Sequence, residues 1–466
     1  MRVAVVGGGI AGLAAALQLH DRLGSGVEIT VIEAGQQAGG KLRTASLAGR
    51  AVETGAETFL ARAADDPSGA PSEAVKLARR LGLGDRLKHP ATTAAGILQS
   101  GELRAIPGGT LMGVPIDVST MDEALRSEAT DHDLGGPILG PGADIAVGAL
   151  VRARAGDAVV DRLVDPLLGG VYAGRADDLS LAATMPGLAA ACRTESTLQD
   201  AVRTALSHRA TTPGPVFATV EGGLSRFVDA IVAALPPGTL RLGLPVRSLV
   251  PARDGWDLTI GSTRDPSMIR ADGVVLALPS HPAARLLGAV SPEAGAAVGV
   301  LDYASIGLVT FVLPAGALDD TGLAERSGAL IPAVEGHLIK AVTVFSTKWA
   351  PQPDGAVLLR ASIGRYGDEQ ALQHSDDELT ALVFDDLAKI LGRSLPVPLA
   401  SSVTRWGGGL PQYAPGHLDR VAAARAALPG TIALAGAAYD GVGIPVCIRS
   451  GHAAAEQIID SWGVRT

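Results

Sequence analysis

The chain has 466 residues and a formal net charge of −9, and 47% of its residues are hydrophobic while 19% are charged. A chain of this length and composition folds into roughly two to four domains, and its acidic balance argues against a nucleic-acid-binding surface. Six of the 39 basic residues are lysines and the other 33 are arginines, whose planar guanidinium groups bind carboxylates through paired hydrogen bonds.

The two cysteines, Cys192 and Cys447, lie far apart and show neither a CxxC pattern nor a metal-binding spacing. We therefore expect no disulfide framework, no redox dithiol and no metal site, as in a protein of the reducing cytoplasm. The apolar stretch from Val3 to Leu19 is interrupted by glycines and has no cleavage-like site after it, which argues against a signal peptide. No apolar run reaches the roughly 18 residues that cross a bilayer, although peripheral membrane contact stays open.

The first 32 residues predict a β–α–β unit. Arg2–Val6 is a short apolar run, typical of a strand buried on both faces of a parallel sheet. A helical pattern runs from Ile10 to about Arg22, with Gly24 just past its end. Val27–Ile32 is rich in β-branched residues and predicts the second strand. This order is that of a dinucleotide-binding fold.

A G-x-G-x-x-G motif joins the first strand to the helix. Gly7 permits the tight turn, Gly9 lets a pyrophosphate approach the backbone, and Gly12 lets the helix pack on the strand. The N–H groups and the positive end of the helix favour bound phosphates. Glu33 ends the second strand, where an acid accepts hydrogen bonds from ribose hydroxyls. The nucleotide-binding residues expected here are Gly7, Gly8, Gly9, Ile10, Ala11, Gly12 and Glu33.

The residues after Glu33 favour FAD over NAD. The string from Ala34 to Gly40 resembles the E-A-x4-G-G fingerprint of amine-oxidase-like flavoproteins. Its paired glycines permit close backbone approach to a cofactor. Arg43 can supply positive charge near the cofactor phosphates, although taken alone it is as easily a surface arginine. No second strand–GxGxxG–helix pattern offers an NAD(P)H site. The string Glu53–Phe59 then resembles the family's loop beside the flavin ring.

The middle of the chain predicts helices. Ser72–Leu81, Met121–Thr130, Ala143–Leu163 and Thr197–His208 each have a helical pattern. Most of them fall in one stretch, which we expect to form a separate helical subdomain.

The remaining sequence returns to an α/β pattern. Strands are expected near Leu308–Leu313 and Val357–Ile363, followed by a helix over Asp376–Leu391. At the C-terminal end, a strand over Thr431–Ala435 leads into a glycine-rich loop and a last helix over Ser450–Trp462. A strand that opens into a helix after small residues supplies a second dipole end for a bound group.

Three further strings make a resemblance specific. They are Pro166–Gly174 (PLLGGVYAG), Leu410–His417 (LPQYAPGH) and Leu434–Gly451 (LAGAAYDGVGIPVCIRSG). Together with the N-terminal motifs, they are similar to the oxygen-dependent protoporphyrinogen/coproporphyrinogen oxidases, above all to their Gram-positive bacterial branch. The similarity runs along nearly the whole chain.

The resemblance implies an α/β fold with a Rossmann-type FAD-binding domain of discontinuous segments, a mixed α/β substrate domain and a helical subdomain. We expect the FAD domain in residues 1–82, 216–285 and 400–466, the substrate domain in residues 83–110 and 286–399, and the helical subdomain in residues 111–215. The same resemblance places non-covalent FAD contacts at the motif residues above and at Ala34, Lys41, Arg43, Gly55, Ala56, Glu57, Thr58, Val246, Trp406, Ala437, Val442, Gly443 and Ile444.

The implied reaction is the FAD-dependent oxidation of coproporphyrinogen III to coproporphyrin III, in haem biosynthesis, with O2 as acceptor and H2O2 as product. The flavin carries the chemistry, so no catalytic side chain is expected. His417 lies in a family-like string, where structural hydrogen bonding is favoured over proton transfer. The implied partners are the porphyrinogen and O2, with handover of the product to a ferrochelatase.

The sequence departs from the family pattern around the substrate. Arg62 is followed by two alanines where many relatives carry a basic residue, and the arginine that some relatives use for a substrate propionate has no clear counterpart near Ile97. No substrate ligand is therefore assigned. Alternatives are a protoporphyrinogen IX oxidase, another amine-oxidase-like flavin oxidase or desaturase, and a non-enzymatic binder of prenylated proteins of the dissociation-inhibitor type.

Overall fold

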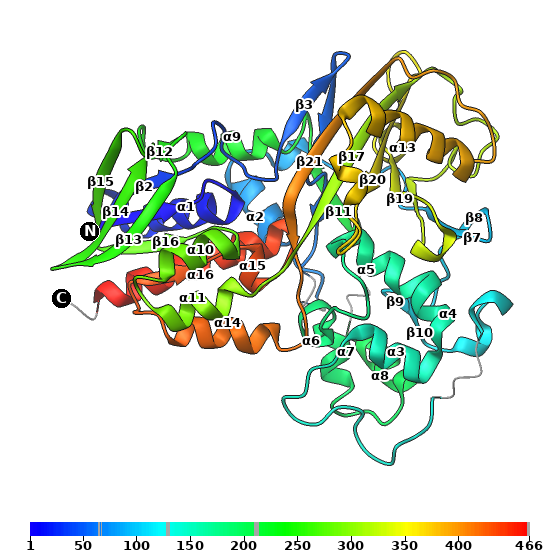
Figure 1. The fold of residues 1–466 in the computed structure, drawn as a ribbon, viewed down its shortest axis with the longest axis horizontal. Coiled ribbons are helices and arrows are strands. Elements are labelled where there is room, and N and C mark those ends of the chain that lie inside the picture. The colour runs from blue at the N-terminus through cyan, green and yellow to red at the C-terminus, as the bar shows by residue number, and fades with distance from the viewer. Residues whose placement is uncertain (64–65, 67, 127–130, 209–213, 464–466) are drawn as a thin grey trace.

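The computed structural model describes residues 1–63, 66, 68–126, 131–208 and 214–463. Figure 1 shows a parallel sheet with helices on both faces, a larger second sheet, and a group of helices beside it. Two long strands, β17 (Tyr303–Leu313) and β21 (Ala400–Pro411), run from the first region into the second. The predicted α/β fold class is confirmed.

The N-terminal β–α–β unit forms the centre of a five-stranded parallel sheet. In sheet order its strands are β12 (Leu240–Arg241), β2 (Glu28–Ile32), β1 (Arg2–Val6), β16 (Gly273–Leu276) and β22 (Ile432–Leu434). The covering helices are α1 (Ile10–Leu23) and α16 (Ile444–Gly463) on one face, and α10 (Ser280–Leu287), α11 (Pro292–Gly299) and α14 (His417–Ala426) on the other. Val3 and Val5 pack against the first group, whereas Ala4 and Val6 pack against the second. Burial on both faces explains why β1 is apolar from Val3 to Val6.

The second sheet has seven strands. Its order is β21, β17, β20 (Val357–Ile363), β19 (Ile339–Val344), β18 (Gly328–Leu330), β7 (Ala95–Gln99) and β8 (Glu102–Ala105). All neighbouring strands are antiparallel except β18 and β7. The helix α13 (Asp376–Ile390) packs on one face, where Val309, Phe311 and Val383 share a core. The predicted strands and helix of this segment are confirmed.

The helical region differs from its prediction at two places. A continuous helix over 143–163 is wrong, because Gly156 adopts φ 91° and ends the first helix. A π-helical turn over Val160–Val164 then leads into the next helix. Of the helix expected over 121–130, the described part holds only a 3-10 turn, Glu123–Leu125, and residues 127–130 lie outside the described residues. The helices are α3 (Val147–Ala155), α4 (Asp157–Val159), α5 (Asp165–Tyr172), α6 (Leu181–Thr184), α7 (Pro186–Ala191) and α8 (Leu198–Ser207).

The C-terminal helix begins at Ile444, six residues before the predicted start at Ser450. Gly441 and Gly443 turn the chain with φ values of 122° and 113°, which favour glycine. Pro445 is tolerated in the first helical turn, where its missing N–H is not needed. The prediction was wrong because it took the whole glycine-rich string for a loop, whereas the string also holds the short helix α15 (Ala437–Asp440).

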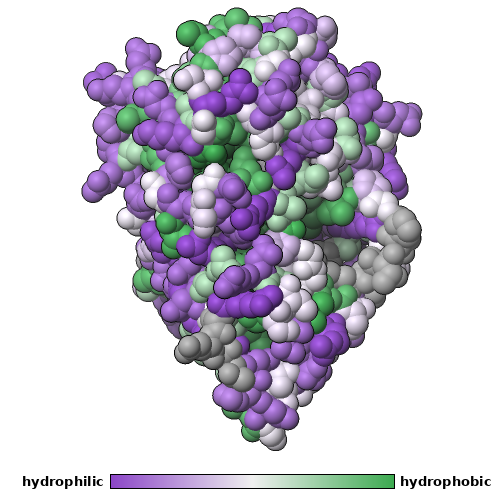
Figure 2. Space-filling view, turned by 90° about the vertical axis from the view of Figure 1, so that its right-hand side faces the viewer, coloured by the Kyte–Doolittle hydropathy of each residue, from purple (hydrophilic) through white to green (hydrophobic). Residues whose placement is uncertain are grey.

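The remaining elements connect these regions. They are β3 (Thr44–Leu47), β4 (Arg50–Glu53), β5 (Phe59–Leu60), α2 (Glu73–Arg80), β6 (Leu87–Lys88), β9 (Thr110–Leu111), β10 (Val114–Pro115), β11 (Phe217–Val220), α9 (Ser225–Ala233), β13 (Val246–Ala252), β14 (Gly255–Gly261), β15 (Pro266–Ala271) and α12 (Phe345–Lys348). Figure 2 shows a face covered mainly by hydrophilic side chains, with hydrophobic ones in separate small groups. Within the described residues, no helix combines the length and the apolarity needed to span a bilayer.

Candidate active site

The turn between β1 and α1 leaves backbone open to a ligand. Gly7 has φ 110°, and a Cβ atom there would lie 2.3 Å from the Ala277 backbone oxygen. A Cβ atom on Gly12 would lie 2.0 Å from the Gly7 oxygen, so helix and turn touch directly. A Cβ atom on Gly9, by contrast, would meet no atom within 4 Å. The turn is therefore closed by Gly7 and Gly12 and open at Gly9, as a pyrophosphate cradle requires.

The Glu33 carboxylate closes this turn. One oxygen accepts a hydrogen bond from the Gly8 N–H at 2.8 Å, and the other accepts one from the Gly35 N–H at 2.7 Å. Each carboxylate oxygen has a further lone pair with which to accept a hydrogen bond from a hydroxyl group. Leu244 donates its N–H to the Glu33 backbone oxygen. This hydrogen bond places Val246, the first residue of β13, close to Glu33.

The second glycine pair lies directly against the first turn. Gly39 donates its N–H to the Gly8 oxygen at 2.8 Å, and a Cβ atom on Gly40 would lie 3.3 Å from the Gly9 Cα. The next residue, Lys41, accepts the Ala56 N–H through its backbone oxygen. The glycine turn, the E-A-x4-G-G string and the loop around residue 56 therefore converge, as the sequence predicted.

The Lys41 ammonium group lies between this loop and α16. Burial lowers its pKa, and it lies close enough to the Cys447 thiol for the two to interact electrostatically. Among the described residues, its ammonium group has no hydrogen-bond or ion-pair partner. A largely buried, unpaired cation at the cofactor cradle suits an anionic or carbonyl-bearing ligand.

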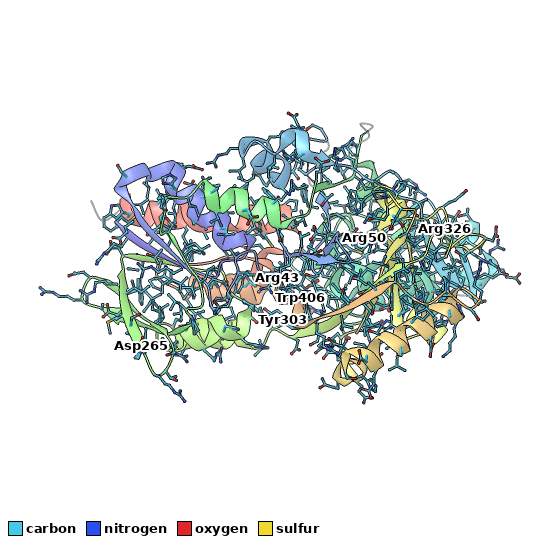
Figure 3. All side chains as sticks on the ribbon, turned by 90° about the horizontal axis from the view of Figure 1, so that it is seen from above. Arg43, Arg50, Asp265, Tyr303, Arg326 and Trp406 are labelled. Atoms are coloured by element: carbon cyan, nitrogen blue, oxygen red, sulfur yellow. The ribbon has the colours of Figure 1, made fainter. Side chains whose placement is uncertain are left out.

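Arg43 and Trp406 meet where the two sheets join. The Arg43 guanidinium lies over the Trp406 ring, with its central carbon 5.5 Å from the ring centroid, and its Nε donates to the Gly40 oxygen at 3.0 Å. The Trp406 Nε1–H donates to the Thr54 oxygen at 2.6 Å. Figure 3 shows Arg43 and Trp406 at this junction, beside Tyr303. Arg43 is thus part of the site and not a free surface arginine, since its side chain is held from both sides.

The loop from Glu53 to Thr58 is fixed by Arg360 of β20. The Arg360 Nη1 donates to the backbone oxygens of Glu53 and Gly55 at 2.9 and 3.1 Å, and its Nη2 donates to the Glu57 carboxylate at 2.9 Å. Lys348 forms a second ion pair with Glu57. The Glu57 carboxylate, predicted as a cofactor contact, is therefore engaged by two cations, Lys348 and Arg360. Arg360 and Lys348 were missed because they lie about 300 residues away in the chain, in segments with no motif.

Glu53 is a buried carboxyl group beside the same loop. Burial raises its pKa to about 7, although hydrogen bonds from the Leu224 N–H at 2.7 Å and from the Thr44 hydroxyl at 3.2 Å favour its charged form. Arg360 also favours the charged form, whereas Glu57 disfavours it. Near neutral pH this group therefore exchanges its proton, a property that its place in the motif did not reveal.

The C-terminal string completes the site. Gly436 lies against α1, since a Cβ atom there would be 3.6 Å from the Ala11 Cβ. Ala437 follows it and accepts the Tyr413 hydroxyl through its backbone oxygen. Val442 packs against the core of the helical region, which includes Tyr172 and Tyr413. A Cβ atom on Gly443 would meet no atom within 4 Å, so the backbone is open there as it is at Gly9. Ile444 is buried at the start of α16.

His417 is enclosed in packing. Its ring lies 4.4 Å from the Tyr413 ring between centroids, and neither ring nitrogen has a hydrogen-bond partner in the described part of the protein. Burial and the nearby Arg420 lower its pKa to about 4, so the ring is neutral at physiological pH. The predicted structural hydrogen bonding is therefore not seen.

Comparison with known proteins settles the family. A family model described as flavin containing amine oxidoreductase matches residues 10–459. The chain belongs to this flavoprotein family. It is an FAD-dependent oxidoreductase, and the prediction of FAD as the cofactor is confirmed, whereas a non-enzymatic binder of prenylated proteins is not supported.

Individual relatives are similar over the full chain. Coproporphyrinogen III oxidase of Mycobacterium tuberculosis is 37% identical, over 98% of this chain and 97% of the relative. Coproporphyrinogen III oxidase of Bacillus subtilis is 32% identical, over 97% and 96%. A crystal structure from Exiguobacterium sp. 255-15, provisionally named a protoporphyrinogen oxidase, superposes with a TM-score of 0.81 at 31% identity and covers 98% of both chains. The predicted resemblance to this family of oxidases is confirmed.

The titration of Glu53 makes a prediction about stability. Because its pKa is raised in the folded state, its favourable contribution is fully present below about pH 4.5 and is lost as the pH rises through about 7. Relative to Glu53→Gln, the FAD-saturated wild type should therefore lose roughly 3 kcal/mol of unfolding free energy over this window. Urea unfolding at half-unit pH steps measures the difference. If the unfolding free energies of the two proteins changed with pH in parallel, the raised pKa of Glu53 would be contradicted.

Proposed function

We propose that this enzyme oxidises coproporphyrinogen III to coproporphyrin III, with O2 as acceptor and H2O2 as product, in haem biosynthesis. The observation that carries the proposal is the 37% identity, over 98% of the chain, to coproporphyrinogen III oxidase of Mycobacterium tuberculosis. The open backbone at Gly9 and Gly443 supports the cofactor that such a reaction needs. We place the reaction in the cytoplasm and propose that the product passes to a ferrochelatase.

The residues of the glycine turn suit the FAD pyrophosphate, and those of the C-terminal string suit its ring system. We propose that FAD contacts the residues predicted above and that the domain boundaries are those predicted above. Glu57 would contact FAD through its backbone, because its carboxylate is paired with Lys348 and Arg360. When bound, FAD would supply a two-electron acceptor for a hydride from a bridging carbon, and three such rounds, each with one O2 reduced to H2O2, would complete the six-electron oxidation. We propose a non-covalent cofactor, since burial raises the pKa of the Cys447 thiol to about 12 and so suppresses its nucleophilic form.

The chain's own residues position and enclose the reacting groups. Arg360 and Trp406 hold the loop of residues 54–57 through its backbone oxygens and so keep it in one place relative to the seven-stranded sheet. The helical region packs against Val442 and thereby covers the C-terminal string. No side chain is required as a base, because the proton leaves a pyrrole that becomes acidic once the bridging carbon has lost a hydride.

A loss of FAD affinity is expected on removing the Glu33 carboxylate. Replacing it with Ala removes the acceptor for ribose hydroxyls and the hydrogen bonds to Gly8 and Gly35. The dissociation constant for FAD should rise by about 10- to 100-fold, corresponding to about 1.5–3 kcal/mol. Titration of the apoprotein with FAD measures the change. Glu28→Ala, an exposed position on the same strand, is the control. Equal affinity of the Glu33 and Glu28 variants would refute the role.

The preferred substrate should carry four carboxylates. Coproporphyrinogen III and protoporphyrinogen IX present the same bridging carbons to the flavin and differ at two positions, propionates in one and vinyl groups in the other. A site arranged for charged groups loses affinity when its partners are left unpaired. We expect kcat/KM for coproporphyrinogen III to exceed that for protoporphyrinogen IX in steady-state assays on freshly reduced substrates. The reverse order would refute the substrate and leave the flavin oxidase assignment intact.

A further inference from the structure

Two buried cations lie side by side at one end of the seven-stranded sheet. Lys340 is the second residue of β19 and is 7% exposed, and Arg365 follows the end of β20 and is 8% exposed. Burial, and then the like charge of Arg365, lower the pKa of Lys340 to about 7. Between them lies Ile331, whose N–H donates to the Lys340 oxygen and whose own oxygen accepts the Arg365 Nη2–H at 2.9 Å.

Neither cation has the anionic partner that burial normally demands. Lys340 has no hydrogen bond or ion pair with any described residue, and Arg365 uses its side chain only for the Ile331 oxygen. The fully enclosed side-chain polar atoms without a partner belong, within the described residues, to Gln99, Gln412 and His417. The free nitrogens of Lys340 and Arg365 are not among them, so they retain contact with open space. Lysine and arginine side chains whose aliphatic parts are buried, and whose charged ends are accessible and unpaired, are suited to binding an anion.

Two of the carboxylates near Arg365, those of Asp165 and Asp386, are engaged by other groups. Asp165, at the start of α5, accepts the Ala176 N–H at 2.8 Å, and burial raises its pKa. Asp386 of α13 accepts the Ile339 N–H and contacts His337 at 2.8 Å. Asp165, Asp368 and Asp386 all interact electrostatically with Arg365, and none of their carboxylates forms a hydrogen bond with its side chain in the described residues. These carboxylates therefore offset part of the positive charge of Arg365 without forming an ion pair with it or with Lys340.

Lys340 and Arg365 lie near the C-terminal string that we propose to bind the flavin ring, because both regions adjoin the helix α5. The helix α5 packs on β18 and β19, and a Cβ atom on Gly170 would lie 3.3 Å from the Leu330 side chain. Two residues after Gly170, at the C-terminal end of α5, Tyr172 belongs to the core against which Val442 packs. Tyr366, next to Arg365, donates its N–H to the Ala173 oxygen and ties the pair to this end of α5.

We propose that Lys340 and Arg365 form a carboxylate-binding subsite that receives a propionate of the porphyrinogen. This inference rests on the proposed function and deepens it, because it assigns a substrate contact where the sequence offered none. Arg365 supplies directed N–H donors, and Lys340 supplies a compact charge that a bound carboxylate stabilises.

The subsite is tested by binding coproporphyrin III to the oxidised holoenzyme, followed by fluorescence quenching. Lys340→Met should weaken binding by 10-fold or more and raise KM for coproporphyrinogen III to a similar extent, with FAD content and kcat nearly unchanged. Lys340→Arg, which keeps the charge, should restore most of the affinity. Lys389→Met, an exposed lysine of α13 in the same sheet–helix unit, should behave like the wild type.

Three outcomes decide the matter. Wild-type affinity and KM in Lys340→Met would overturn the subsite while coproporphyrinogen oxidation by the same preparations upholds the proposed function. Equal losses in Lys340→Met and Lys340→Arg would also overturn it, because they would report damage to packing and not the loss of a charge. A wild-type holoenzyme that neither binds nor oxidises the tetracarboxylates would refute the proposed function itself.

Discussion

The Arg360 guanidinium is the interaction on which the candidate site depends. It belongs to the seven-stranded sheet, yet its donors satisfy two backbone oxygens and one carboxylate of the loop at residues 53–57. The side chains of Arg360 and Glu57 are 11% and 10% exposed, so breaking the pair would leave buried charge without compensation. The loop at residues 53–57 is therefore held in one position relative to the seven-stranded sheet. Trp406, bonded to Thr54 from the same sheet, strengthens this attachment.

Three distant chain segments meet around this attachment. The glycine turn of β1 and α1 contacts the E-A-x4-G-G string through Gly39, and it contacts the C-terminal string through Ala11 and Gly451. A Cβ atom on Gly451 would lie 2.2 Å from the Ala11 oxygen, which shows how closely α16 lies on α1. Both helices point their N-termini into the region where the open glycines lie. Such a constellation favours an extended, doubly charged cofactor such as FAD, because the phosphates and the ring system each find exposed backbone.

The parts of this architecture that were predictable from the sequence are local. The β1–α1 turn, β2 and Glu33 lie within 33 residues and carry a motif in which each glycine has its own steric reason. The clamp of Arg360 on Glu57 spans 303 residues and consists of residue types that are common on surfaces, so no local pattern marks it. The break at Gly156 and the early start of α16 were missed for another reason. A glycine can end a helix, precede one or lie in a loop, and tertiary contacts decide which. Lys340 and Arg365 show no motif either, and only their burial side by side distinguishes them.

The central claim is that the FAD of this protein takes electrons from coproporphyrinogen III. The most direct measurement is the flavin absorption of the holoprotein after anaerobic mixing with freshly reduced coproporphyrinogen III. We expect the oxidised flavin band to disappear under anaerobic conditions, when each FAD can take two of the six electrons, and we expect admitted O2 to restore the band, release H2O2 and let porphyrin absorption rise as the oxidation is completed. A flavin band that stays unchanged over many minutes with excess substrate, in a protein whose FAD is still reduced by dithionite, would contradict the account.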